Sequence, residues 1–204
     1  MATAALGFAP HSGWAVAVGV CAAGRRPRIV LRDRISMTAS GDLRAKHPYH
    51  AVEGMDLAEA AERLAADAAS AETMAYEAVR RLAARLADEG HRVAGAGILD
   101  SVGRKGVPLA SILASHALVH AAEGDHFRSA LDGAATRCGL PVVRVPAREL
   151  DSRAARADGR PIAALRALLD TVGRPMGPPW GADQKAAALL GWLVLATAAR
   201  EDQA

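Results

Sequence analysis

The first 24 residues contain no Lys, Arg, Asp or Glu, and this uncharged stretch constrains the fold more than any other feature of the chain. Apolar residues run over 4–9, stop at Pro10-His11-Ser12-Gly13, and resume over 14–21. Two apolar runs separated by a turn signal predict two strands joined by a tight turn. Because no basic segment precedes the apolar residues, we interpret the stretch as buried strands and not as an export signal.

The remaining pattern predicts a third strand and then alternating helices and strands. Charged residues interspersed among β-branched residues indicate a partly exposed strand over 28–37. The chain contains 51% hydrophobic residues, and 49 of its 204 residues are Ala, so we expect small side chains to let the helices lie close to a sheet. We predict a single domain over 1–204. Its later elements are expected as one helix or a pair of helices over 56–88, strand over 91–99, helices over 109–122 and 125–137, strand over 142–145, and helices over 161–172 and 182–199.

Composition excludes several classes of protein. The net charge of +3 does not by itself indicate a nucleic-acid partner. The uncharged run from Ala186 to Ala199 is shorter than the roughly 20 residues that span a bilayer, so no membrane segment is expected. Cys21 and Cys138 form no CxxC pair, which argues against a disulfide framework and favours a cytoplasmic location. Only three residues are lysines, namely Lys46, Lys105 and Lys185.

Three short stretches and the order of elements resemble a known family. The chain opens with Gly7-Phe8-Ala9-Pro10, its fourth strand ends in Ile98-Leu99-Asp100, and its last helix begins Ala182-Asp183-Gln184-Lys185 after a Pro-rich loop. This pattern is similar to that of the RuvC-type Holliday-junction resolvases. The resemblance implies the ribonuclease-H-like α/β fold: a mixed five-stranded sheet whose first three strands are antiparallel, with helices on both faces.

The resemblance also implies a chemistry that this chain supports only in part. Such nucleases cleave phosphodiesters with two Mg²⁺ ions, which need several converging carboxylates. The four acidic positions of the family fall on Ala9, Asp100, Asp183 and Ala186, so only Asp100 and Asp183 remain as tentative catalytic and metal-binding residues. One interpretation is a rearranged site in which His11 and Lys185 join the two acids around a cleft. The other is an inherited fold whose nuclease site has decayed.

A Gly-rich loop offers a second kind of site. Gly103-Arg104-Lys105-Gly106 precedes a predicted helix and resembles a phosphate-binding turn, although it lacks the P-loop pattern. The alternative is a solvated loop whose charges favour solubility. If the loop binds phosphate, Arg104, Lys105, Asp183 and Lys185 would serve a small phosphorylated ligand or nucleotide.

A third candidate is a metal site on a helix. His116, His120 and Glu123 stand at i, i+4 and i+7, so they share one face of the predicted helix and fit the ligand types that Zn²⁺ prefers. An incidental histidine pair on an Ala-rich helix is the alternative. Two other segments receive no function: the long connection over 38–55, and the Arg-rich stretch over 144–160, which we interpret as an exposed face.

The sequence therefore predicts a resolvase-like, nucleic-acid-associated protein with a degenerate or inactive two-metal site. A protein or enzyme for a small phosphorylated ligand is the alternative function. A structural role in a homo-oligomer is the remaining possibility.

Overall fold

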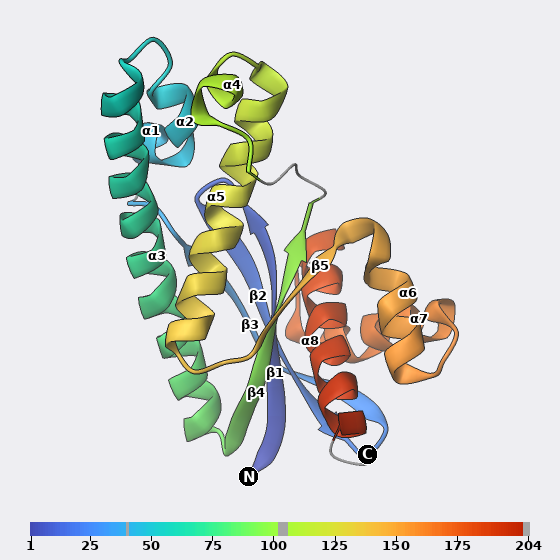
Figure 1. Ribbon diagram of the computed structural model, residues 1–204. Coiled ribbons are helices and arrows are strands. Elements are labelled where there is room, and N and C mark those ends of the chain that lie inside the picture. The colour runs from blue at the N-terminus through green and yellow to red at the C-terminus, as the bar shows by residue number, and fades with distance from the viewer. Residues whose placement is uncertain (40, 102–105, 202–204) are drawn as a thin grey trace.

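The computed structural model describes residues 1–39, 41–101 and 106–201. Its centre is one five-stranded sheet in the order β3-β2-β1-β4-β5 (Figure 1). The first three strands pair antiparallel, and β4 and β5 continue the sheet parallel to β1. This topology confirms the predicted fold class. The strands are β1 (Ala2–His11), β2 (Trp14–Ala23), β3 (Arg26–Ser36), β4 (His91–Asp100) and β5 (Val142–Pro146).

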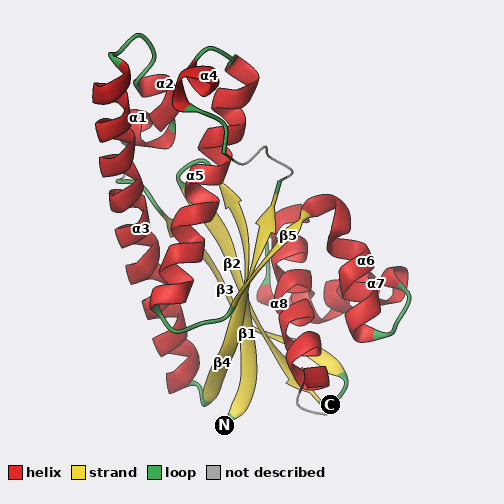
Figure 2. Cartoon of the chain, in the orientation of Figure 1, coloured by secondary structure: helices red, strands yellow, loops and turns green. Residues whose placement is uncertain are grey.

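Helices cover both faces of the sheet, as predicted (Figure 2). One face packs on α3 and α5, and its core contains Phe8, Ile98 and Phe127. The other face packs on α8, with α6 and α7 beside it, and its core contains Ala9 and Leu190. Short helices gather beyond the sheet at one end (Figure 1). The helices are α1 (Leu43–Lys46), α2 (Pro48–Ala51), α3 (Leu57–Asp88), α4 (Leu109–Leu113), α5 (His116–Arg137), α6 (Ala147–Asp158), α7 (Ile162–Gly173), the 3₁₀ turn η1 (Arg174–Met176) and α8 (Ala182–Glu201).

The last helix lies unusually close to the sheet because small residues line the contact. Gly7 of β1 faces the backbone of α8 so closely that a Cβ atom there would overlap the carbonyl oxygen of Ala187. Gly97 of β4 likewise faces Leu190. The uncharged run from Ala186 to Ala199 thus belongs to α8, and its buried residues pack on the sheet. Among the described residues, no helix is long and apolar enough to cross a membrane.

Three local expectations differ from the structure. The helices expected over 109–122 and 125–137 are instead the short α4 and the long α5, because Gly124 continues α5 without breaking it. The stretch over 147–158 forms α6, which buries Leu150 and Ala154 among its charged residues. The connection over 38–55 contains α1 and α2. For α5 and α6, the packing of a few apolar side chains outweighs a weak local signal.

Candidate functional site

The last residue of β1 meets the first turn of α8. The ring nitrogen Nε2 of His11 lies 2.9 Å from Oδ2 of Asp183, and both side chains are partly exposed. The structure thus brings together two of the residues singled out in the sequence, 172 positions apart in the chain. An exposed imidazole oriented by a carboxylate is an arrangement that can bind a ligand or move a proton.

Trp14, the first residue of β2, extends this pair into a stack. The His11 ring lies parallel to the indole, with 4.2 Å between the ring centroids and 9° between the planes. The guanidinium of Arg34 on β3 lies 4.1 Å from the indole centroid. The His11 ring and the Arg34 guanidinium lie 4.2 Å and 4.1 Å from the indole centroid and cannot both fit on the same side of it. The indole therefore lies between His11 and Arg34. The stack holds a cation at the surface beside His11.

A small basic pocket of about 250 Å³ opens beside the stack. Arg34 and Lys46 supply its cations. The Asp33 carboxylate accepts a hydrogen bond from the Arg34 backbone N–H, but within the described ranges no carboxylate forms an ion pair with the Arg34 guanidinium or the Lys46 ammonium group. Ser36 and Thr38 add hydroxyl groups that can donate hydrogen bonds. Two such cations with hydroxyl donors fit an anion such as a phosphate group. The pocket is lined by Gly13, Trp14, Arg34, Ser36, Thr38, Ala39, Gly41 and Lys46.

Sequence reasoning missed most of this pocket. Lys46 was noted only as one of three lysines, and the connection that carries it received no function. Two features of the sequence could have indicated this pocket: lysine is rare in the chain, and the connection that carries Lys46 is long. Long ordered connections are often functional. The turn at Gly13 brings the segments together, because Thr38 and Lys46 pack directly on that glycine.

The two family positions that lack an acid are apolar here in structure as well as in sequence. Ala9 is buried with 1% of its surface exposed, in the core beneath α8. Ala186 packs against the same core from the first turns of α8. Only methyl groups therefore occupy these two positions, and of the four positions only Asp183 offers a carboxylate on this face of the sheet.

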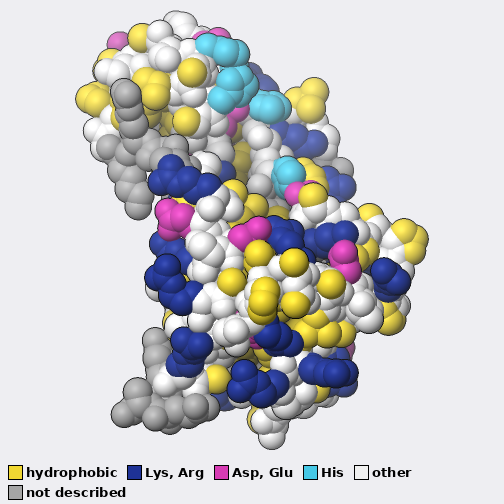
Figure 3. Space-filling view, turned by 90° about the vertical axis from the view of Figure 1, so that its right-hand side faces the viewer, with side chains coloured by type: hydrophobic (Ala, Val, Ile, Leu, Met, Phe, Trp, Pro, Cys, Tyr) yellow, Lys and Arg dark blue, Asp and Glu magenta, His cyan; other side chains and the backbone are white. Residues whose placement is uncertain are grey.

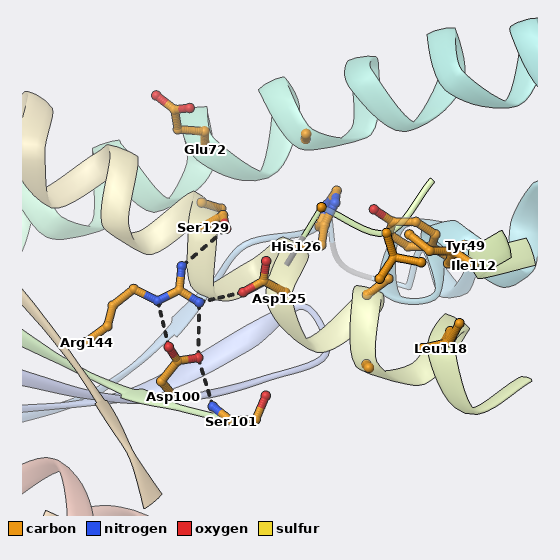
Figure 4. A pocket seen from close by; sticks show the side chains of 16 residues that line it. Tyr49, Glu72, Asp100, Ser101, Ile112, Leu118, Asp125, His126, Ser129 and Arg144 are labelled. Carbon is orange, nitrogen blue, oxygen red and sulfur yellow. Dashed lines mark hydrogen bonds and ion pairs between the residues drawn. The ribbon is translucent and has the colours of Figure 1, made fainter. Parts of the chain in front are cut away.

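Asp100 lies on the opposite face, and this differs from the expected cleft. Side chains alternate along a strand. Ile98 packs in the core under α3 and α5, while Leu99 packs with Ala9 in the core under α8. Asp100 therefore returns to the α5 face, where it meets Arg144 (Figure 4). The structure does not bring Asp100 and Asp183 together.

Asp100 is fully engaged by its neighbours. Arg144 of β5 donates from Nε and Nη2 to its two carboxylate oxygens, at 3.1 Å each. Arg128 of α5 approaches to 3.2 Å, and the backbone N–H of Ser101 donates at 2.8 Å. Burial acts to raise the pKa of Asp100, but the hydrogen bonds and charge of Arg144 outweigh it and hold that pKa below its ordinary value. The carboxylate is thus a structural ion-pair partner.

A cavity of about 590 Å³ adjoins this ion pair (Figure 4). Arg144, Asp125 and Ser129 form its polar end, whereas Tyr49 and Ile112 lie at the other end. Gly106, the last residue of the turn predicted to bind phosphate, lines the cavity together with Ser101. Arg104 and Lys105 of that loop lie outside the described residues, so their role stays a prediction.

Lys185 points to another partner. Its Nζ lies 2.9 Å from Oδ1 of Asp170 on α7. The ion pair ties the start of α8 to α7. Lys185 is therefore not a free cation of the His11–Asp183 site, although it follows Asp183 closely in the sequence.

The structure separates the three residues that were predicted as one metal-binding set. Glu123 is buried and groups with His47 and His50, whereas His116 and His120 group with His50. His116 and His120 lie on the exposed surface of α5, with 3.0 Å between their Nε2 atoms. Two histidines that sequence reasoning missed, His47 and His50, join them from the connection over 38–55. Figure 3 shows histidine side chains gathered in one patch toward the upper end of the molecule.

Comparison with known proteins supports the fold alone. No protein-family model matches the sequence, and no curated protein shows significant sequence similarity to it. Among the solved structures that resemble the chain are RuvC from Thermus thermophilus and T. thermophilus RuvC in complex with a Holliday junction substrate. Each has 14% sequence identity and a TM-score of 0.53 over 98% of this chain, and the matches cover 97% and 96% of the respective RuvC chains. The chain thus has a ribonuclease-H-like fold similar to that of RuvC.

Proposed function

We propose that this protein binds nucleic acid through the basic pocket beside Trp14, and that it does not hydrolyse phosphodiesters by a two-metal mechanism. The observation that carries the proposal is the pairing of a basic pocket with a carboxylate-poor site at the end of β1. Arg34 and Lys46 supply the positive charge there, while Ala9 replaces the central acid. A similar fold binds a Holliday junction substrate in RuvC.

The two remaining carboxylates, Asp100 and Asp183, do not fit the pair of Mg²⁺ ions that the fold family implies. Hard divalent cations need several oxygen ligands that converge on one point. Asp183 already pairs with His11, and Asp100 pairs with two arginines on the opposite face. A pair of Mg²⁺ ions held here would repel one another without a bridging carboxylate between them. This supports the loss of the nuclease site.

The basic pocket suits a sugar-phosphate backbone better than an isolated nucleotide. Lys and Arg neutralise backbone phosphates and release counterions, which supplies affinity without base readout. Trp14 is already stacked between His11 and Arg34, so it is a poor platform for an unpaired base. We therefore expect the pocket to contact phosphates and not bases. The phosphorylated-ligand alternative stays a prediction, since its two loop cations lie outside the described residues.

Salt-dependent binding tests this proposal. Fluorescence anisotropy with duplex, single-stranded and four-way-junction DNA should give affinities that fall steeply between low and physiological salt. Replacing Arg34 or Lys46 with alanine should weaken binding and lower the salt slope by about one for each phosphate that is no longer neutralised. Arg81→Ala, an exposed change on α3, is the matched control and should bind as the wild type does.

Two results would overturn the proposal. The first is no binding to any of these nucleic acids at low salt. The second is binding that Arg34→Ala and Lys46→Ala leave unchanged. A rise in melting temperature with a nucleotide, without binding to DNA, would favour the phosphorylated-ligand alternative.

Two further expectations accompany the function. Cys21 is buried and Cys138 is half-buried, and neither forms a disulfide, which suits the reducing cytoplasm that we propose as the location. The two large hydrophobic cores pack on opposite faces of one sheet, which supports a single domain over 1–204. A homo-oligomer stays a prediction.

A further inference from the structure

Four histidines and a buried glutamate converge where α2 meets α5. His47 and His50 come from α2 and the residue before it, and His116, His120 and Glu123 come from α5; we name these five residues the histidine cluster. Their segments are firmly placed, because Val52 is fully buried just after α2 in a small apolar core with Ala60 and Leu64 of α3. The cluster is thus part of the packed structure.

Three imidazoles of the cluster lie at metal-binding spacing. The Nε2 atoms of His116 and His120 are 3.0 Å apart, and the His50 ring centroid lies 5.5 Å and 5.0 Å from those of His116 and His120. One ligand atom from each of the three lies within 4.8 Å of the others. Tetrahedral Zn²⁺ with Zn–N bonds of 2.0–2.1 Å separates its nitrogens by about 3.3 Å. The three rings therefore need only small side-chain shifts to share one ion.

Glu123 prepares His50 for this role. The glutamate is only 2% exposed, and its Oε1 lies 2.8 Å from Nδ1 of His50 and 3.3 Å from the His50 backbone nitrogen. Its other oxygen lies 3.4 Å from Nδ1 of His47. An ionised carboxylate only accepts hydrogen bonds, so the Nδ1 atom of His50 carries a proton. In the neutral ring the Nε2 atom is then unprotonated and available to a metal ion.

This arrangement matches the usual support of a metal-bound histidine. Such ligands commonly donate their other ring N–H to a carboxylate, which fixes the tautomer and the ring orientation. A buried carboxylate also needs compensating partners, and Glu123 has His50 and His47 in that place. His116 and His120 are exposed, so water can complete the coordination. Imidazole nitrogen is a ligand that suits Zn²⁺.

We propose that the histidine cluster binds one Zn²⁺ ion through His50, His116 and His120, with Glu123 as the positioning residue. The sequence pattern had suggested Glu123 as a direct ligand; the contacts assign that position to His50. The ion would link the connection over 38–55 to α5. The proposal does not depend on nucleic-acid binding, because the basic pocket uses none of these side chains.

Calorimetric titration of the full, chelator-treated chain with Zn²⁺ tests the site. We expect one ion per chain and a rise in melting temperature of about 5–10 °C at a hundredfold excess over the dissociation constant. The double change His116→Ala and His120→Ala should abolish both effects. Both residues are exposed on a helix and alanine is the strongest helix former, so this variant should fold. Arg81→Ala, an exposed change on α3 outside both sites, is the control and should bind Zn²⁺ normally.

The positioning role of Glu123 has its own readout. Glu123→Gln keeps the shape of the side chain but removes its charge, and it should weaken Zn²⁺ binding about 10–100-fold. Co²⁺ in place of Zn²⁺ should give the visible absorption of a four-coordinate ion in the wild type, and that spectrum should be lost in the double histidine variant. Absence of binding, or binding that survives the double change, would overturn the proposal.

Discussion

Asp100→Asn should lower the free energy of unfolding by about 3 kcal/mol, which is the loss typical of removing one partner from a largely buried ion pair. Asp100 is 14% exposed, and the arginines that it neutralises, Arg128 and Arg144, are 12% and 18% exposed. Asparagine keeps the shape of the side chain but removes the charge that Arg128 and Arg144 share. Arg144 keeps its ion pair with Asp125, whereas Arg128 has no other ion-pair partner among the described residues. A carboxylate reserved for metal ions would behave in the opposite way, since its removal relieves repulsion.

The effect should depend on pH in a defined direction. The pKa of Asp100 is lower in the folded protein than in the unfolded chain, where an aspartate has its ordinary value of about 3.9. Its contribution is therefore complete above the unfolded value and is lost as the pH falls through the folded value. Urea unfolding at neutral pH should show the full difference between wild type and variant, and the difference should shrink in strong acid.

Asp132→Asn is the matched control for this experiment. Asp132 lies 3.9 Å from the same Arg144 but is 38% exposed, so its loss should change stability little. Equal stability of the Asp100→Asn variant and the wild type, or greater stability of the variant, would contradict the structural role of Asp100.

Gly7→Ala should destabilise the protein by about 3 kcal/mol, at the upper end of the range for overpacked cores. The new Cβ would overlap the carbonyl oxygen of Ala187 and lie 2.8 Å from the backbone nitrogen of Gly191. Both atoms belong to the backbone of α8, which cannot move aside as a flexible side chain would. The overlap can be removed only if α8 moves away from the sheet, and Asp183 at the start of α8 would move with it.

Gly133→Ala provides the comparison for Gly7. A Cβ at Gly133 would meet the end of the Glu72 side chain at 3.0 Å, and that side chain can rotate away. Alanine also favours the helix by about 1 kcal/mol over glycine, so Gly133→Ala should be neutral or stabilising. Thermal or urea unfolding of the two variants should give clearly different stabilities. If Gly7→Ala proved as stable as Gly133→Ala, the close contact of α8 with β1 would be refuted.

Much of the fold could be predicted from the sequence because its strongest signals are local. The uncharged runs and the turn at Gly13 define the first two strands, and the Ala-rich period defines α3. The boundaries of the helices were harder to predict from the sequence. Gly124 suggested a break that α5 does not have, and the charged residues of α6 masked the few apolar side chains that it buries.

The candidate sites were harder to predict because they join segments that are distant in the chain. The family resemblance led us to expect His11 and Asp183 in one cleft with Asp100 and Lys185. The face on which Asp100 lies depends on the strand alternation, and a shift of one residue reverses it. His50 had no periodic partner in the sequence. It reaches His116 and His120 only through the packing of α2 on α5, which no local pattern records.

We propose that this ribonuclease-H-like fold lacks a working two-metal nuclease site. The most direct measurement incubates the purified protein with a labelled four-way junction and an RNA–DNA hybrid in Mg²⁺ or Mn²⁺, and separates the strands on a denaturing gel. We expect both substrates to remain intact at every metal concentration. Metal-dependent cleavage that disappears in Asp100→Asn or Asp183→Asn would contradict the claim.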